Sequence, residues 1–137
     1  MPGATSYRSS CPLASALDIV GDKWSLIIIR GFFVGFSRYG DFLKGPEPIA
    51  TNILADRLQM LECVGLIERV VKNSPRSPYR LTAKGADLLP VLQELSDWGY
   101  HHIADRWRPP EWFVKAKPKD FYPKNDPAPA RRRARKG

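Results

Sequence analysis

The sequence predicts an α+β fold that is mostly helical, and three features of the pattern support this. Between residues 11 and 64, four segments have apolar residues at helical spacing and are separated by glycine or proline. The spacing then becomes extended over residues 66–71, and turn residues at 73–78 lead to a second short extended segment at 79–81. A long helical pattern closes the domain at about residue 102.

Capping residues and glycines bound the first two predicted helices. Ser10 is predicted to cap a helix that has Pro12 near its first turn and ends at Gly21. Asp22 is predicted to cap the second helix, a strongly apolar segment that Gly35 closes. Both helices are therefore expected to be short.

A proline turn separates the next two helices. Ser37 opens a short third helix, and the two prolines of residues 44–48 then exclude a helix, because proline lacks an N–H and restricts the residue before it. The fourth helix is predicted from about Ala50 to Val64. Leucines at helical spacing give it a buried stripe, and five residues fall on its opposite side: Asn52, Ala55, Asp56, Gln59 and Cys63.

A hairpin and a closing helix complete the domain. The two extended segments are joined by turn chemistry, and Thr82 then caps a helix in which Pro90 predicts a kink or a fresh start. This order of helices, hairpin and closing helix is the layout of a winged helix-turn-helix domain with a two-stranded β-hairpin wing. The third helix, the proline turn and the fourth helix would form the helix-turn-helix unit.

The exposed start of the fourth helix carries residue types that suit DNA bases. In a helix-turn-helix, the second helix lies in the major groove and its N-terminal residues contact base edges. Asn52 and Gln59 can pair with adenine, Thr51 can contact thymine, and small Ala55 allows a close approach. Asp56 is included in this predicted reading face. The alternative, that Thr51 and Asn52 only cap a solvated helix, stays open on this segment alone.

A basic run in the hairpin favours the DNA interpretation. Five basic residues and no acidic one lie in the interval from Arg69 to Lys84: Arg69, Lys72, Arg76, Arg80 and Lys84. Such a turn beside a groove-reading helix can follow phosphates or enter the minor groove. Ser37 and Arg38, at the start of the third helix, are added to the predicted DNA contacts, although a plain solvent role for Arg38 is an alternative. Arg57 is predicted to make either a structural salt bridge or a DNA contact.

The net charge of +8 does not itself indicate DNA binding by the domain. Residues 106–137 hold eleven basic and three acidic residues, whereas residues 1–105 hold eleven of each. We therefore divide the chain into a flexible N-terminal arm (1–10), a DNA-binding and dimerisation domain (11–105) and a basic, Pro-rich C-terminal tail (106–137). Aromatic residues in the first half of the tail are predicted to pack on the domain or on a dimer mate, and its end is predicted to be disordered.

Several function classes lack support in the sequence. No apolar stretch approaches the ~20 residues of a membrane span, and the N-terminus does not resemble a signal peptide. Two cysteines make neither a disulfide framework nor a metal site, which fits the cytoplasm. No catalytic constellation or phosphate-binding loop is present. We therefore expect a cytoplasmic protein that is not an enzyme and has no metal or cofactor.

Five segments together resemble one family of regulators. CPLASALDIVGDKWSLIIIRGFF, SRYGDFL, IATNILADRLQMLECVGLIER, YRLTAKG and LLPVLQELSDWG occur in this order over about residues 11–103. They resemble HxlR-type winged helix-turn-helix transcriptional regulators. The resemblance implies a dimeric bacterial DNA-binding protein that represses or activates nearby genes. It also implies that the N-terminal segment and a long last helix form the dimer interface, here through Leu13, Leu92, Leu95, Trp98 and Ile103.

This chain departs from the family pattern at two places. Ala50 stands where many members carry a serine that would cap the recognition helix. Members also commonly end soon after the last helix, whereas this chain continues beyond Arg108.

Cys11 is the position that the resemblance ties most closely to regulation. Some members use a cysteine here to sense oxidants or electrophiles, and a thiol near a helix N-terminus can react as the thiolate. The alternative is a small, inert residue buried in the N-terminal packing. Cys63 is predicted to be incidental.

The resulting hypothesis is a homodimeric transcriptional regulator, most simply a repressor, bound to a pseudo-palindromic double-stranded DNA operator. Its response to a small molecule or an oxidant, the latter through Cys11, is part of this hypothesis. The alternative is a winged-helix protein-interaction module with non-specific DNA affinity from the basic tail.

Overall fold

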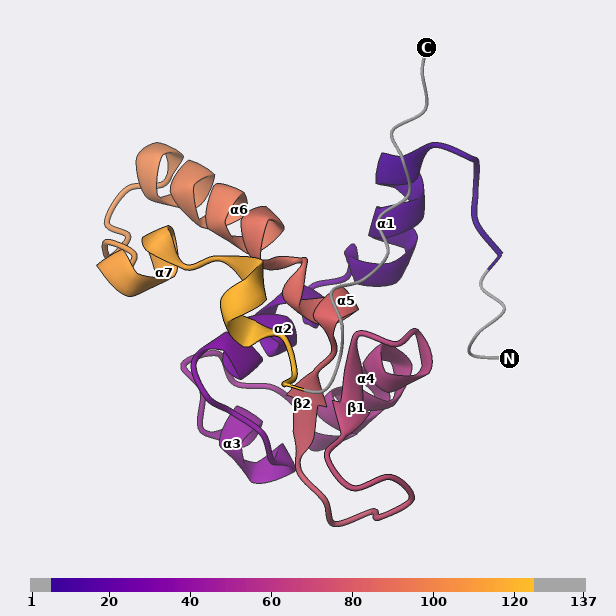
Figure 1. The fold of residues 1–137 in the computed structure, drawn as a ribbon. Coiled ribbons are helices and arrows are strands. Elements are labelled where there is room, and N and C mark those ends of the chain that lie inside the picture. Colours follow the sequence, from indigo (N-terminus) through magenta and orange to yellow (C-terminus); the bar gives the residue numbers. More distant parts are fainter. Residues whose placement is uncertain (1–5, 125–137) are drawn as a thin grey trace.

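A computed structural model describes residues 6–124 of the chain (Figure 1). The helices and strands follow the predicted order: α1 (Pro12–Val20), α2 (Ser25–Phe33), α3 (Tyr39–Leu43), α4 (Thr51–Cys63), β1 (Ile67–Arg69), β2 (Tyr79–Leu81), α5 (Ala83–Ala86) and α6 (Leu89–His102). Helix α7 (Glu111–Lys115) and the 3₁₀ turn η1 (Pro118–Phe121) come after them. The mostly helical α+β prediction, with a hairpin wing and a long helix behind it, is confirmed.

Three leucines of α4 anchor the helix-turn-helix unit in the core. Leu54 and Leu61 are fully buried and Leu58 is 2% exposed. They share one cluster with Ile28 and Ile29 of α2. The predicted stripe is therefore the packed face of α4, and the opposite face is turned outward.

The two strands pair antiparallel and are shorter than the first predicted segment. Ile67 lies opposite Leu81, and Arg69 opposite Tyr79. Val70 still donates its N–H to the carbonyl of Pro78 at 2.9 Å, but Pro78 has no N–H with which to continue the ladder. Proline therefore ends the sheet before the predicted boundary at residue 71.

Side-chain hydrogen bonds mark the starts of α3 and α5. Thr82 caps α5 as predicted, since its hydroxyl oxygen accepts from the N–H of Gly85 at 3.1 Å. The predicted cap by Ser10 is wrong, because Cys11 occupies the cap position of α1. The third helix begins two residues after Ser37, because the Asp41 carboxylate accepts from the N–H groups of Ser37 and Arg38.

Pro90 marks a fresh start. The single long helix predicted after Thr82 is two helices, α5 and α6, and Pro90 lies in the first turn of α6. The missing N–H of proline is tolerated there, because the first-turn N–H groups have no partner within the helix.

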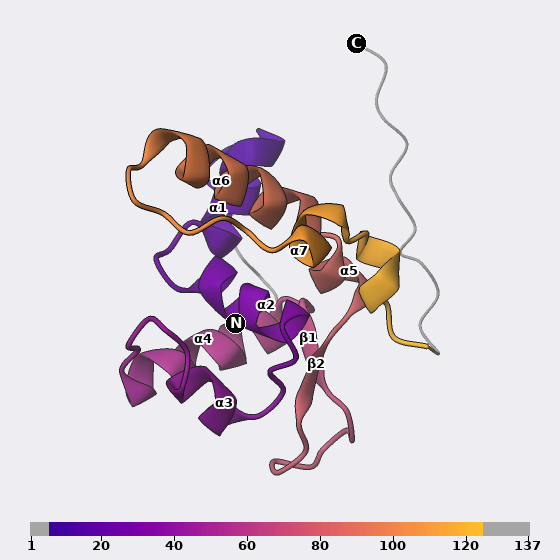
Figure 2. The ribbon, with the colours of Figure 1, turned by 90° about the vertical axis from the view of Figure 1, so that its left-hand side faces the viewer.

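The segment 111–124 packs on its own chain (Figure 2). Phe113 is 8% exposed, and the ring of Phe121 meets Phe33 edge to face with centroids 4.8 Å apart. The side-chain amide of Gln93 donates to the carbonyls of Phe113 and Ala116, both at 2.9 Å. Of the two predicted placements for the aromatic residues, the structure therefore has the one on the domain itself. The arginine-rich end and residues 1–5 lie outside the described residues.

Within residues 6–124, no helix combines the length and the hydropathy needed to cross a membrane.

Gly85 is a point where the fold allows no side chain. A Cβ added there would lie 2.0 Å from the carbonyl oxygen of Leu66, which is backbone and cannot easily move. We expect Gly85→Ala to lower the free energy of unfolding by about 3 kcal/mol or more, as overpacking against backbone does. Urea denaturation followed by circular dichroism measures this change.

Gly40→Ala is the matched control, because nothing lies within 4 Å of a Cβ at Gly40. Replacing a helical glycine in open space with alanine is expected to raise stability by up to about 1 kcal/mol. Equal effects of the two substitutions would contradict the packing of α5 against Leu66.

Candidate nucleic-acid interface

The start of α4 is exposed and is held by α3. The phenol of Tyr39 donates to the carbonyl of Thr51 at 3.0 Å and so joins the two helices of the unit. Ala50 occupies the cap position of α4 without a side-chain hydrogen bond, and Thr51 and Asn52 are exposed. The first turn of α4 therefore has no capping side chain at Ala50, and its N–H groups suit an anion. The sequence did not predict this role of Tyr39, because its helical spacing indicated only an apolar helix position.

The predicted reading face of α4 is exposed as a whole. Asn52, Ala55, Asp56 and Gln59 all lie on the surface. Asp56 differs from the others because it forms a 2.5 Å ion pair with Arg57, the next residue of the helix. The uncharged members of the face are therefore the ones suited to hydrogen bonds with bases.

A groove of about 800 Å³ lies between this face, α3 and the wing. It brings together four of the predicted DNA contacts: Arg38, Ala55, Gln59 and Arg76. Others do not line it: Ser37, Thr51, Asn52, Asp56, Lys72 and Arg80. The groove also contains Tyr79, where burial raises the pKa of the phenol.

Four of the five basic residues of the wing region lie on the strands and the turn, and they differ in their surroundings. The guanidinium of Arg69 lies 4.0 Å from the ring centre of Tyr79 and donates to the carbonyl of Ser77 at 2.7 Å. Arg80 forms a 2.8 Å ion pair with Glu68, its cross-strand neighbour. The prediction of uncompensated charge between Arg69 and Lys84 did not consider Glu68, which comes just before this interval. Lys72 and Arg76 are exposed on the turn.

Arg38 connects the helix-turn-helix unit to the wing. Its guanidinium donates to the backbone carbonyl of Arg76 at 3.1 Å. The carbonyl of Ser37 accepts from the N–H of Tyr79 at 2.8 Å, a second link between the same two parts. Together these bonds place the basic turn beside α3 and α4.

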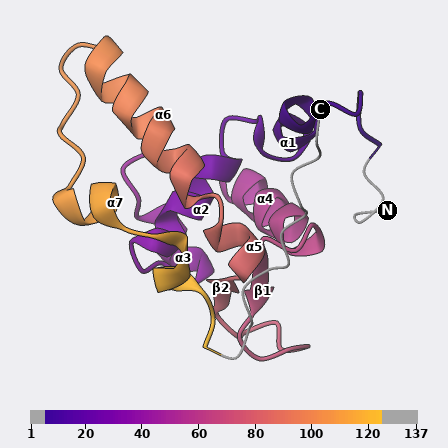
Figure 3. The same cartoon turned by 45° about the horizontal axis from the view of Figure 1, so that its top comes forward.

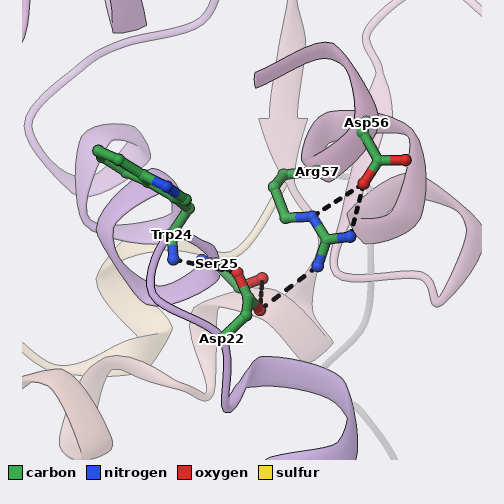
Figure 4. Close-up of polar contacts among 5 residues, drawn as sticks. All are labelled: Asp22, Trp24, Ser25, Asp56 and Arg57. Carbon is green, nitrogen blue, oxygen red and sulfur yellow. Dashed lines mark hydrogen bonds and ion pairs between the residues drawn. The ribbon is translucent and has the colours of Figure 1, made fainter. Parts of the chain in front are cut away.

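Asp22 holds the start of α2 next to α4 (Figure 4). Its carboxylate accepts from the N–H groups of Trp24 and Ser25, both at 3.0 Å, and from the Ser25 hydroxyl. Arg57 of α4 lies 3.6 Å from the same carboxylate. Of the two readings predicted for Arg57, the structure has the salt bridge.

The pKa of Asp22 reflects this arrangement. Burial raises the pKa of the carboxyl, but the Ser25 hydroxyl, the two N–H groups and Arg57 outweigh it and hold the pKa below its ordinary value. The ionised form of Asp22 is therefore the stabilising one.

The residues assigned to dimerisation and sensing lie on or next to α1 and α6, away from the wing and α3 (Figure 1). Four of them are largely exposed on or next to α1 and α6: Leu13, Leu95, Trp98 and Ile103. Leu92 is 6% exposed and packs in the core of its own chain, so it has little area to offer a partner. Cys11 is exposed at the head of α1, which differs from the buried alternative, and Cys63 is exposed on α4.

In the described part of the chain, no three His, Cys, Asp or Glu residues group as a metal site would require.

A two-helix unit with an exposed reading face, flanked by a basic wing, defines a winged helix-turn-helix DNA-binding protein. The chain belongs to the HxlR-like helix-turn-helix family, which it matches over residues 19–106. The HTH-type transcriptional regulator sll1512 of Synechocystis is 37% identical over 94 residues, which cover 64% of this chain and 70% of that protein. Mb3122 of Mycobacterium bovis, also an HTH-type transcriptional regulator, is 38% identical over 100 residues, which cover 69% of this chain and 61% of that protein.

Solved structures show the same fold. PA1607, described as a transcription factor, is 38% identical with a TM-score of 0.66, and the match covers 74% of this chain and 73% of that one. The reduced form of the transcriptional regulator YodB from B. subtilis is 29% identical with a TM-score of 0.57, covering 72% and 100%. The redox regulator HypR in its oxidised form is 30% identical with a TM-score of 0.60, covering 67% and 97%.

The Asp22 cluster predicts a loss of stability that depends on pH. At pH 7, we expect Asp22→Ala to lower the free energy of unfolding by about 1–2 kcal/mol, through the lost cap and the weakened tie to Arg57. Because the pKa is lower in the folded chain, this contribution is complete above the ordinary value of 3.8 and is lost as the pH falls through the folded value. Urea denaturation at pH 7 and at a series of acid pH values measures it.

Asp22→Asn is the control, because asparagine keeps the size of the side chain and an oxygen that can cap, and replaces the charged carboxylate with a neutral amide. This variant should lose less stability than Asp22→Ala. Like Asp22→Ala, it should lack the part of the fall in the free energy of unfolding at acid pH that comes from Asp22. A difference between wild type and Asp22→Ala that grew towards low pH would contradict the assignment.

Proposed function

We propose that the chain acts as a homodimeric, sequence-specific transcriptional regulator, most simply a repressor. The observation that carries this proposal is the outward face of α4 beside a groove bordered by Arg38 and Arg76. Two copies would insert α4 into successive major grooves of a pseudo-palindromic operator, with half-site centres about 34–36 Å apart.

Base reading in this proposal belongs to residues 51–59, the N-terminal part of α4. Asn52 and Gln59 carry amides that can pair with adenine, and Thr51 can contact thymine. Ala55 lies between them and keeps the helix surface low enough for a close approach. The N–H groups at the start of α4 favour a phosphate, which fits the lack of a capping side chain at Ala50.

Phosphate contacts would come from the elements around α4. Lys72 and Arg76 project from the wing turn, and Ser37 and Arg38 lie at the start of α3. Arg80 would contribute less charge because Glu68 pairs with it. Such contacts orient a protein on the duplex and add salt-dependent affinity without reading sequence.

Dimerisation is assigned to α1 and α6. Leu13, Leu95, Trp98 and Ile103 are 49–69% exposed, a set of large apolar side chains that a partner would remove from water. These helices lie at the opposite end from the wing and α3 (Figure 1). A dimer joined there leaves both reading faces free.

Asn52→Ala tests sequence reading. We expect it to weaken operator binding by about 1–3 kcal/mol and to leave the affinity for a scrambled duplex almost unchanged, because a bidentate base contact is lost. Fluorescence anisotropy with the DNA upstream of its own gene, at near-physiological salt, measures both. A chain ending at Lys124 is suited to this test, because it keeps α7 and η1 and removes the arginine-rich end.

Lys72→Ala is the matched control. It should weaken binding to the operator and to the scrambled duplex by the same factor. It should also reduce the slope of log affinity against log salt concentration by about 1. Equal losses on both duplexes with Asn52→Ala would remove Asn52 from the reading set. No selectivity in the parent chain would favour the protein-interaction alternative.

A response to oxidants through Cys11 is the second part of the proposal. The thiol is exposed on α1, in the segment assigned to dimerisation, and HypR, a structural neighbour, is a redox regulator. Oxidation by peroxide would make a sulfenic acid at this position and alter the contacts of α1 with a partner.

Cys11→Ser tests this response. We expect hydrogen peroxide to change the operator affinity of the parent chain and of Cys63→Ser at least about fivefold, within the usual range of allosteric coupling. Cys11→Ser should show no change. An unchanged response in Cys11→Ser would exclude Cys11 as the sensor.

A further inference from the structure

An apolar pocket of about 470 Å³ lies where the chain after α6 turns back past α2. We call it the arm pocket. Its main apolar walls come from α2, from α6 and from the segment 107–113, through Leu26, Ile27, Leu92, Leu95, Trp107 and Trp112. Figures 1 and 3 show this returning segment and α7 alongside α6. The outer wall lies beyond residue 106, where the family match ends.

Two indole rings border the pocket while largely open to water. Trp107 is 75% exposed and Trp112 is 46% exposed. Large aromatic rings gain most from being covered, and flat rings stack well against them. The exposed indoles therefore favour an occupant with a flat, apolar surface.

The polar groups at the wall are few and already balanced. Arg30 is the one charged residue among the described lining residues, and both of its terminal nitrogens bond to Glu47, at 2.9 and 2.5 Å. The pair therefore presents little net charge to an anion. Ser96 adds a hydroxyl that can donate or accept one hydrogen bond.

The pocket is formed before anything binds. Gln93 of α6 holds the carbonyls of Phe113 and Ala116, and the ring of Phe113 is buried in the core. A ligand would therefore not have to order the part of the wall around Phe113, which reduces the entropic cost of binding. The volume also falls within the usual range of small-molecule sites.

We propose that the arm pocket binds a neutral, flat, aromatic small molecule. The molecule stacks on Trp107 and Trp112, and one polar group reaches Ser96. A second copy of the chain is the competing occupant, because Leu95 also borders the exposed face of α6. The small molecule fits better, because three segments of one chain already line the space, and the charge of Arg30 at its wall is already neutralised by Glu47.

The test is a fluorescence titration of the full chain with N-phenyl-1-naphthylamine, a neutral aromatic probe that brightens when it leaves water. We expect saturable binding of one probe per chain. Trp107→Ala removes a largely exposed wall and should not impair folding, and Ser96→Phe fills the space. Each should weaken binding about tenfold or more.

Val114→Ala is the matched control, because this side chain is 60% exposed on α7, is not part of the lining and has no role in the proposed dimer interface. It should change the affinity by less than about twofold. Circular dichroism of each variant confirms that it is folded.

Three outcomes would overturn the proposal: no saturable binding, full affinity in Trp107→Ala or in folded Ser96→Phe, or an affinity that rises as the protein is diluted. The last outcome would assign the pocket to a second copy. Because the titration contains no DNA, failure here leaves the proposed regulator function unaffected.

Discussion

The burial of one leucine stripe determines what α4 can do. Leu54, Leu58 and Leu61 are almost completely removed from water, and each contributes about 1.5–3 kcal/mol by leaving it. No exposed ion pair on α4 matches this, since such pairs contribute about 0–1 kcal/mol. The rotation of the helix is therefore set by its core side, and the opposite side faces outward whatever its residues are. Polar contacts such as Asp22 with Arg57 then fix finer details of position.

Much of the fold could be predicted because the signals are local. Helical spacing, glycines and prolines placed the helices and the hairpin in the right order, since each acts within a few residues. The errors arose where one hydrogen bond, made or missing, decides between neighbouring residues. Asp41 moves the start of α3 away from Ser37, and Pro78 shortens β1 by denying it a donor. Neither effect changes the apolar pattern from which the elements were predicted.

The sequence predicted which residues of the candidate site are exposed. It did not predict the hydrogen bonds and ion pairs among them. Helical spacing alone places Asn52 and Gln59 on the surface. The bond from Tyr39 to the Thr51 carbonyl, and that from Arg38 to the Arg76 carbonyl, join residues far apart in sequence through backbone atoms. Every residue has a backbone carbonyl, so a hydrogen bond to one cannot be predicted from the type of the accepting residue. The pairing of Glu68 with Arg80 follows from strand register, which the sequence left open.

A domain without net charge can still present a basic surface, because its acidic groups are placed elsewhere or used internally. Near the helix-turn-helix unit, Asp41 caps α3 and Glu47 pairs with Arg30. The remaining acids include Glu94 and Asp97 of α6, which lies at the end of the molecule away from the wing (Figure 1). Asp56 and Glu62 are the exceptions, since Asp56 is exposed on the reading face, where Arg57 pairs with it, and Glu62 lines the groove. An anionic duplex approaching α4 therefore meets Arg38, Lys72 and Arg76 and little repulsion from acidic groups. Residues 1–105 have no net charge, but the separation of basic and acidic groups within them still gives a basic surface at this place.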